Sequence, residues 1–146
     1  MANLDVEIVT PGDAGYERVR HVYSATGRPA RVLLPRDAAQ TARAIEHARA
    51  LGGPLAIRSG GHGISSIATN DGGTVIDLRH LNRIEHLGGT RVAIGPGARW
   101  GAVARELYGW ALLSLPATPG TWASGGSRPR VASVCSGGCR DSRSTG

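Results

Sequence analysis

One segment near the middle of the chain limits its fold more than any other. Residues 30–34 and 55–57 are short, largely apolar runs, and a helical pattern lies between them. That pattern starts at Asp37, which forms a capping box with Gln40, and it stops at the glycine pair 52–53. A buried strand on each side of a helix predicts a right-handed parallel crossover. The chain is therefore expected to be an α/β protein.

Periodicity and turn signals predict the remaining elements. Strands are expected over 74–78 and 91–94, with a turn at 88–89. A helix is expected over 100–110, in which Trp100 and Trp110 pack into the core. A short helix within 15–25 would turn Val19 and Val22 toward the core. In the helix after Asp37, steps of four and three predict one buried stripe: Ala38, Ala42, Ile45, Ala48 and Leu51.

The basic residues bear on possible partners. All 17 are arginine, and the chain lacks lysine and phenylalanine, which a GC-rich coding sequence explains without a functional cause. The net charge is +6, but no motif or aromatic platform for nucleic acid accompanies it. A basic nucleic-acid-binding module stays as an alternative from another class. No apolar run approaches the ~20 residues of a membrane span, and no signal peptide is recognisable, so a cytoplasmic protein without a membrane partner is expected.

The second strand leads directly into a glycine-rich loop, Arg58-Ser59-Gly60-Gly61-His62-Gly63. Glycines let backbone N–H groups approach an anion closely, so the loop is a candidate phosphate site. A glycine pair is equally common in plain turns, and the loop alone leaves both interpretations open. It does not match G-x-G-x-x-G, and the chain has no lysine for a P-loop. These two kinds of nucleotide site are therefore disfavoured.

A longer run around this loop is more specific. It reads R-S-G-G-H-G-I-S-S-I-A-T-N-D-G-G-T-V-I-D-L-R-H-L-N-R-I-E from residue 58, and V-A-I-G-P-G-A-R-W-G-A-V follows from residue 92. Over residues 28–109 the chain resembles the FAD-linked oxidases with a PCMH-type FAD-binding domain, in particular the berberine-bridge-enzyme-like oxidoreductases. The resemblance implies an α/β domain, incomplete here, with an N-terminal β-α-β subdomain and the start of the second subdomain. Residues 1–27 would form a helical lead-in.

The resemblance also implies a site and an activity. In that family the loop holds the FAD pyrophosphate, and its histidine, here His62, often bonds covalently to the flavin. The implied reaction oxidises an alcohol, sugar or amine carbon by hydride transfer to FAD, with oxygen as electron acceptor. The small-molecule substrate would bind in a longer parent protein, and no catalytic acid or base is assigned in this chain. The residues placed at the cofactor are Arg58, Ser59, Gly60, Gly61, His62, Gly63 and Ile64.

Residues 110–146 depart from the family pattern. They are rich in arginine, glycine and serine. A shifted reading frame permits V-P-A-G-D-T-G-N-V-G-V-G-G, which suits the continuation of the family. We therefore expect a non-native or disordered tail, and a truncated chain that is inactive alone. The alternative to an oxidoreductase is a non-catalytic remnant with residual or no FAD binding.

Other potential ligands are interpreted as incidental. Cys135 and Cys139 have no second pair of ligands, so no metal site is expected. Four histidines lie outside the loop and are expected to be structural or to face solvent: His21, His47, His80 and His86.

Overall fold

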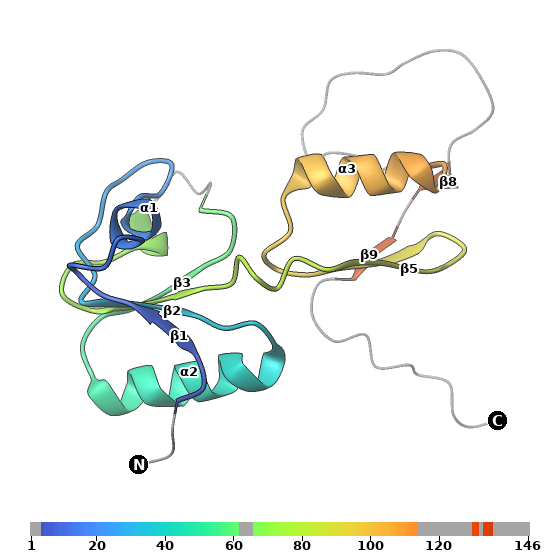
Figure 1. Cartoon of the computed structure of the whole chain (residues 1–146). Helices are drawn as coiled ribbons and strands as arrows, with labels where there is room; N and C mark the ends of the chain where they lie inside the picture. Colours follow the sequence, from blue (N-terminus) through green and yellow to red (C-terminus); the bar gives the residue numbers. More distant parts are fainter. Residues whose placement is uncertain (1–3, 62–65, 114–129, 132, 136–146) are drawn as a thin grey trace. The chain divides into compact units, whose positions relative to one another are not determined.

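The computed structural model describes residues 4–61, 66–113, 130–131 and 133–135. The chain divides into two compact units, the first ending at Asn82 and the second starting at Arg83. Figure 1 shows the first unit in blue to yellow-green. Its elements are β1 (Glu7–Val9), α1 (Tyr16–Arg20), β2 (Arg31–Leu34), α2 (Ala38–Leu51), β3 (Leu55–Arg58), η1 (Ser66–Ala68) and β4 (Thr74–Asp77).

The first unit is built on a four-stranded sheet with the order β1-β2-β4-β3. Strands β2, β4 and β3 are parallel, and β1 runs antiparallel to β2. The predicted β-α-β unit is present, but its two strands are not neighbours, because β4 inserts between them. This arrangement confirms the α/β fold expected from the sequence.

Helices α1 and α2 cover opposite faces of this sheet (Figure 1). On one face Tyr16 and Val19 of α1 pack against side chains of β2, β3 and β4. On the other face Ala44 and Ala48 of α2 pack against β2 and β4. Their small side chains let the helix lie close to the strands. The two faces together enclose the central strands, whose residues Val32 and Val75 are fully buried.

The sequence places the ends of α2 correctly. The carboxylate of Asp37 accepts a hydrogen bond from the Gln40 N–H at 2.7 Å, and the Gln40 side chain accepts one from the Arg36 N–H at 2.8 Å. Gly52 ends the helix with a φ of +69°, a conformation that glycine adopts without strain. The capping box and the glycine stop are thereby confirmed.

The predicted stripe of α2 is wrong in part. Ala44 and Ala48 are buried and Ile45 is half-buried, whereas three members of the expected stripe are exposed: Ala38, Ala42 and Leu51. Alanine occurs on several sides of this helix, so its pattern does not fix which face meets the sheet. In the structure the face with Ala44 and Ala48 meets Leu33 of β2 and Ile76 of β4.

Removal of the cap should weaken the first unit measurably. Asp37→Ala deletes the acceptor for the Gln40 N–H, so we expect the free energy of unfolding to fall by about 0.5–2 kcal/mol. Urea unfolding followed by circular dichroism measures this change. Asp37→Ser keeps a capping oxygen and should stay close to the wild type. Equal losses in both variants would contradict the capping role.

The N-terminal lead-in differs from the expectation. It contains the strand β1 as well as a helix, and the helix is shorter than residues 15–25. The backbone at His21 is extended, with φ −85° and ψ 137°, which ends α1 after Arg20. Strand β1 has only three residues, of which Val9 alone is buried, so the sequence has no clear apolar–polar alternation that would predict it.

The second unit contains β5 (Ile84–Gly88), β6 (Arg91–Ile94), α3 (Trp100–Gly109), β7 (Leu112–Leu113), β8 (Arg130–Val131) and β9 (Ser133–Cys135). Strands β5 and β6 form an antiparallel hairpin, and its turn glycines, Gly88 and Gly89, have φ values of +97° and +60°. Strand β9 pairs parallel with β6, and β8 pairs parallel with β7. The core contains Val92 and Val103.

Two further expectations concern this unit. Trp110 is half-buried beside the core and stacks on His86, but Trp100 is 66% exposed, so its predicted packing role is wrong. Trp100 opens α3 and lies outside the cluster that the helix buries. Within the expected tail, most residues lie outside the described ranges, and the shifted-frame hypothesis stays a prediction. No helix among the described residues is long and apolar enough to span a bilayer.

Candidate functional site

The glycine-rich loop lies within the first unit and begins at the carboxyl edge of its parallel strands. Arg58, the last residue of β3, pairs in register with Asp77, the last residue of β4. The Leu78 N–H donates to the Arg58 carbonyl at 2.8 Å, which keeps the strands together up to the point where the loop begins. Ligands of open α/β sheets bind at such carboxyl ends.

The described part of the loop presents backbone donors. Within the described ranges, the N–H groups of Gly60 and Gly61 make no hydrogen bond, and Gly60 is exposed. Gly61 has a φ of +68°, and a Cβ there would lie 3.4 Å from Arg58 Cδ. The Gly61 carbonyl accepts a hydrogen bond from the Tyr23 N–H at 3.0 Å, which fixes the loop to the segment after α1. Successive backbone N–H groups of this kind can hold an anion.

The Arg58 side chain points away from solvent and anchors the loop from within. It is only 3% exposed. Its Nε and Nη2 donate to Asp77 Oδ2 at 2.9 and 2.6 Å. The same guanidinium donates to the carbonyls of Val19 and His21, at the carboxyl end of α1. Arg58 thus joins β3, β4 and α1, while its predicted contact with a cofactor stays a prediction.

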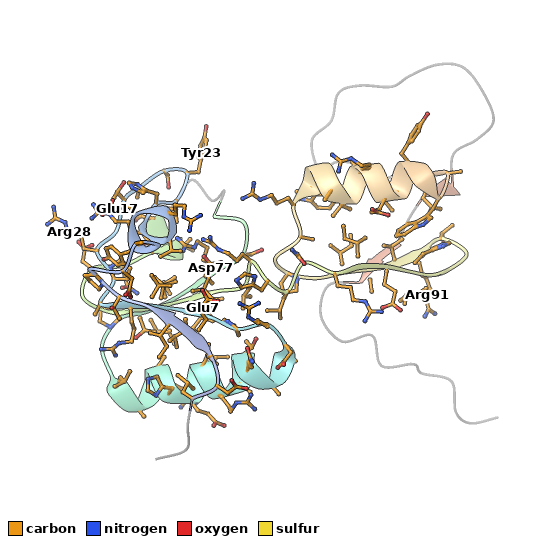
Figure 2. The ribbon with its side chains drawn as sticks, viewed as in Figure 1. Glu7, Glu17, Tyr23, Arg28, Asp77 and Arg91 are labelled. Carbon is orange, nitrogen blue, oxygen red and sulfur yellow. The ribbon has the colours of Figure 1, made fainter. Side chains whose placement is uncertain are left out.

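Asp77 accepts hydrogen bonds from a second arginine. Arg79 donates through Nε at 3.0 Å and Nη2 at 2.7 Å to Asp77 Oδ2, and through its backbone N–H at 3.0 Å to Oδ1. Asp77 is 1% exposed and Arg79 is 41% exposed. Figure 2 labels Asp77 among the side chains of the first unit. Burial alone would raise the pKa of Asp77, but the hydrogen bonds from Arg79 and the charges of Arg58 and Arg79 outweigh it and lower the pKa. Asp77 is therefore ionised at neutral pH.

Sequence reasoning did not single out Asp77 or Arg79. The available signal is an acidic residue at the end of an otherwise apolar strand, T-V-I-D, because a buried carboxylate requires a cationic partner. Parallel pairing of this strand with β3 brings that carboxylate to Arg58. The sequence predicts both strands, but neither their pairing nor their register.

The other predicted site residues divide into two groups. Ser59 and Gly60 are exposed and Gly61 is half-buried, all at the carboxyl edge of β3. Three lie outside the described residues: His62, Gly63 and Ile64. Of the remaining histidines, His21 and His86 are exposed, and His47 and His80 are half-buried. Among the described residues, no cluster of three histidine, cysteine or acidic side chains could hold a metal ion.

Comparison with known proteins gives a consistent result. The family model described as "FAD binding domain" matches residues 29–128. The (R)-6-hydroxynicotine oxidase of Paenarthrobacter nicotinovorans is 31% identical over 116 residues, which are 77% of this chain and 25% of that protein. An FAD-dependent monooxygenase of Fusarium proliferatum is 37% identical over 82 residues, 55% of this chain and 16% of its own length. This chain thus spans about a quarter or less of these relatives.

Solved structures agree in fold. A crystal structure of 6-hydroxy-D-nicotine oxidase from Arthrobacter nicotinovorans aligns with a TM-score of 0.69 and 31% identity, over 76% of this chain and 26% of that one. Chitooligosaccharide oxidase aligns with a TM-score of 0.67 and 27% identity, over 73% and 24% of the two chains. The family match covers more than half of the chain and includes the loop after β3. The chain therefore belongs to the family of FAD-linked oxidoreductases with a PCMH-type FAD-binding domain.

Proposed function

We propose that this chain binds FAD at the loop after β3, with the backbone N–H groups of residues 59–63 around the pyrophosphate and His62 as the covalent link to the flavin. The observation that carries this proposal is the pair of glycines at the carboxyl edge of β3, whose N–H groups make no hydrogen bond within the described residues. The family match supports the cofactor. The covalent link rests on the resemblance of the loop to the family motif.

The residues present fit such a group. Gly61 adopts a positive φ of +68°, so the chain can turn there without strain and keep its backbone accessible. Arg58 and Asp77 hold the start of the loop rigidly from inside the protein. Preorganisation of this start lowers the cost of ordering on ligand binding. The proposed role of Arg58 is therefore support, and that of the glycines is direct contact.

We further propose that the protein to which this domain belongs is an oxidase of an alcohol, sugar or amine carbon. FAD bound in this domain would supply the hydride acceptor for that oxidation, with oxygen as the final electron acceptor. Two relatives, a hydroxynicotine oxidase and a chitooligosaccharide oxidase, support an amine or a sugar as the substrate class. A histidine such as His62 suits covalent attachment because a neutral imidazole has a nucleophilic nitrogen lone pair.

Flavin retention tests both parts of the proposal. The purified chain is incubated with FAD and precipitated with acid, and the pellet is examined for yellow colour. We expect colour that resists acid in the wild type and in His47→Ala, a control on α2. We expect His62→Ala to bind FAD but to release it on precipitation. A chain that neither retains FAD nor gains thermal stability from it would support the non-catalytic remnant instead.

A further inference from the structure

The charges around Asp77 do not balance. Two guanidinium groups, those of Arg58 and Arg79, donate to the same carboxylate oxygen of Asp77. Asp77 is ionised, so the three side chains together carry one net positive charge. Arg58 is 3% exposed and Arg79 is 41% exposed, so the excess charge is accessible only at Arg79.

This excess charge lies at the edge where the loop begins. Arg58 and Asp77 are register partners at the ends of β3 and β4, and Arg79 follows Asp77 by two residues. The guanidinium of Arg79 is fixed there by its two bonds to Asp77 Oδ2. Backbone donors of the glycine pair and a fixed cation therefore occupy one edge of the sheet, which favours an anionic ligand.

One part of the Arg79 guanidinium remains available. Its Nε and Nη2 donate to Asp77, and Nη1 makes no hydrogen bond to any residue in the described ranges. Arginine binds phosphate oxygens well because its donors form a planar, always charged fork. Arg79 could thus keep its bonds to Asp77 and donate to a phosphate at the same time.

We propose that Arg79 is a cofactor-binding residue that donates to the phosphate oxygens of FAD, and that Asp77 is the residue that positions it. This inference rests on the proposed binding of FAD and adds a side-chain contact to the backbone contacts of the loop. A phosphate is favoured over a substrate carboxylate because the glycine donors lie at the same edge.

Reversible FAD binding tests the proposal. All chains carry His62→Ala to prevent covalent attachment, and the dissociation constant of FAD is measured at low and high salt. Arg79→Gln is expected to weaken binding about tenfold and to reduce its salt dependence, since one phosphate contact is lost. Arg79→Lys keeps the charge, so its affinity for FAD should lie between that of Arg79→Gln and that of the chain with His62→Ala alone. Arg49→Gln, exposed at the end of α2 and so at the opposite edge of the sheet, removes the same charge and should change the affinity less than twofold.

Three outcomes would overturn the proposal. If Arg79→Gln and Arg49→Gln bind FAD equally well, Arg79 makes no phosphate contact, while the proposed FAD binding stands. If Arg79→Gln loses affinity with an unchanged salt dependence, its role is support of the loop and not contact with phosphate. If the chain that carries only His62→Ala binds no FAD and the wild type retains none, both this inference and the proposed function fail. Urea unfolding of each variant establishes that the fold is intact.

Discussion

Replacing Asp77 by asparagine is expected to cost about 3–5 kcal/mol of unfolding free energy, because the Arg58 charge would remain buried without a counter-charge. Arg58 is 3% exposed, so water cannot replace the lost partner. Its other contacts are backbone carbonyls of Val19 and His21, which are neutral. A domain has only about 5–15 kcal/mol of stability, so this loss would remove a large share of it.

An exposed ion pair of the first unit provides the matched control. Arg36 and Glu7 form a 2.8 Å pair, with side chains that are 62% and 46% exposed. Glu7→Gln removes that pair in water, so we expect a loss of no more than about 1 kcal/mol. Urea unfolding by circular dichroism compares the two variants. If Asp77→Asn costs no more than Glu7→Gln, the buried pair does not support the loop.

Acid should remove the contribution of Asp77 to stability. The pKa of Asp77 is lowered in the folded protein, so its contribution to stability is present above the ordinary carboxyl pKa of about 4 and is lost as the pH falls through the lower, folded value. The wild type should therefore lose stability as the pH falls below about 4. Asp77→Asn lacks this group, so the corresponding part of the acid dependence should be absent.

Local signals predicted those parts of the fold that depend on neighbouring residues. The cap of Asp37, the stop at Gly52 and the hairpin turn at Gly88–Gly89 each involve contacts within a few positions, and the structure has all three. The insertion of β4 between β2 and β3 depends on residues far apart, and periodicity carries no information about it. Strand β3 is expected to be buried, but it lies at the edge of the sheet, and Ile57 is 54% exposed.

The candidate site also combines features set by neighbouring residues with features set by residues far apart in the sequence. The motif identifies the loop and its glycines because their backbone geometry is encoded locally. The roles of Arg58 and Asp77 depend on the register of two parallel strands, which brings together residues 19 positions apart. The run of residues that resembles the family contains both Arg58 and Asp77, but it does not show that their side chains form an ion pair. The loop residues that contact a ligand and the pair that holds the loop are separate parts of the same site.

Gly73→Ala is expected to destabilise the first unit by about 3 kcal/mol, the upper part of the usual range for overpacking. A Cβ at Gly73 would lie 2.1 Å from the Pro54 carbonyl oxygen and 2.9 Å from Asn70 Oδ1. Pro54 O accepts a hydrogen bond from the Thr74 N–H at 2.9 Å, so displacing it opens the start of β4 from the start of β3. Backbone atoms cannot yield as a flexible side chain would.

Gly73 also connects the start of β4 to its other neighbouring strand, β2, so an added Cβ is harder to accommodate. Its carbonyl accepts from the Ala30 N–H at 2.8 Å, and its N–H donates to Asn70 Oδ1 at 3.1 Å. Gly15→Ala is the control, because its Cβ would meet only Val9 Cγ1 at 3.9 Å, and its stability should change by less than about 1 kcal/mol. Thermal unfolding of both variants distinguishes a glycine required by close packing from one that is not. If Gly73→Ala were as stable as Gly15→Ala, the starts of β3 and β4 could separate without cost. That result would contradict the tight pairing of these strands, which holds the loop at their other end.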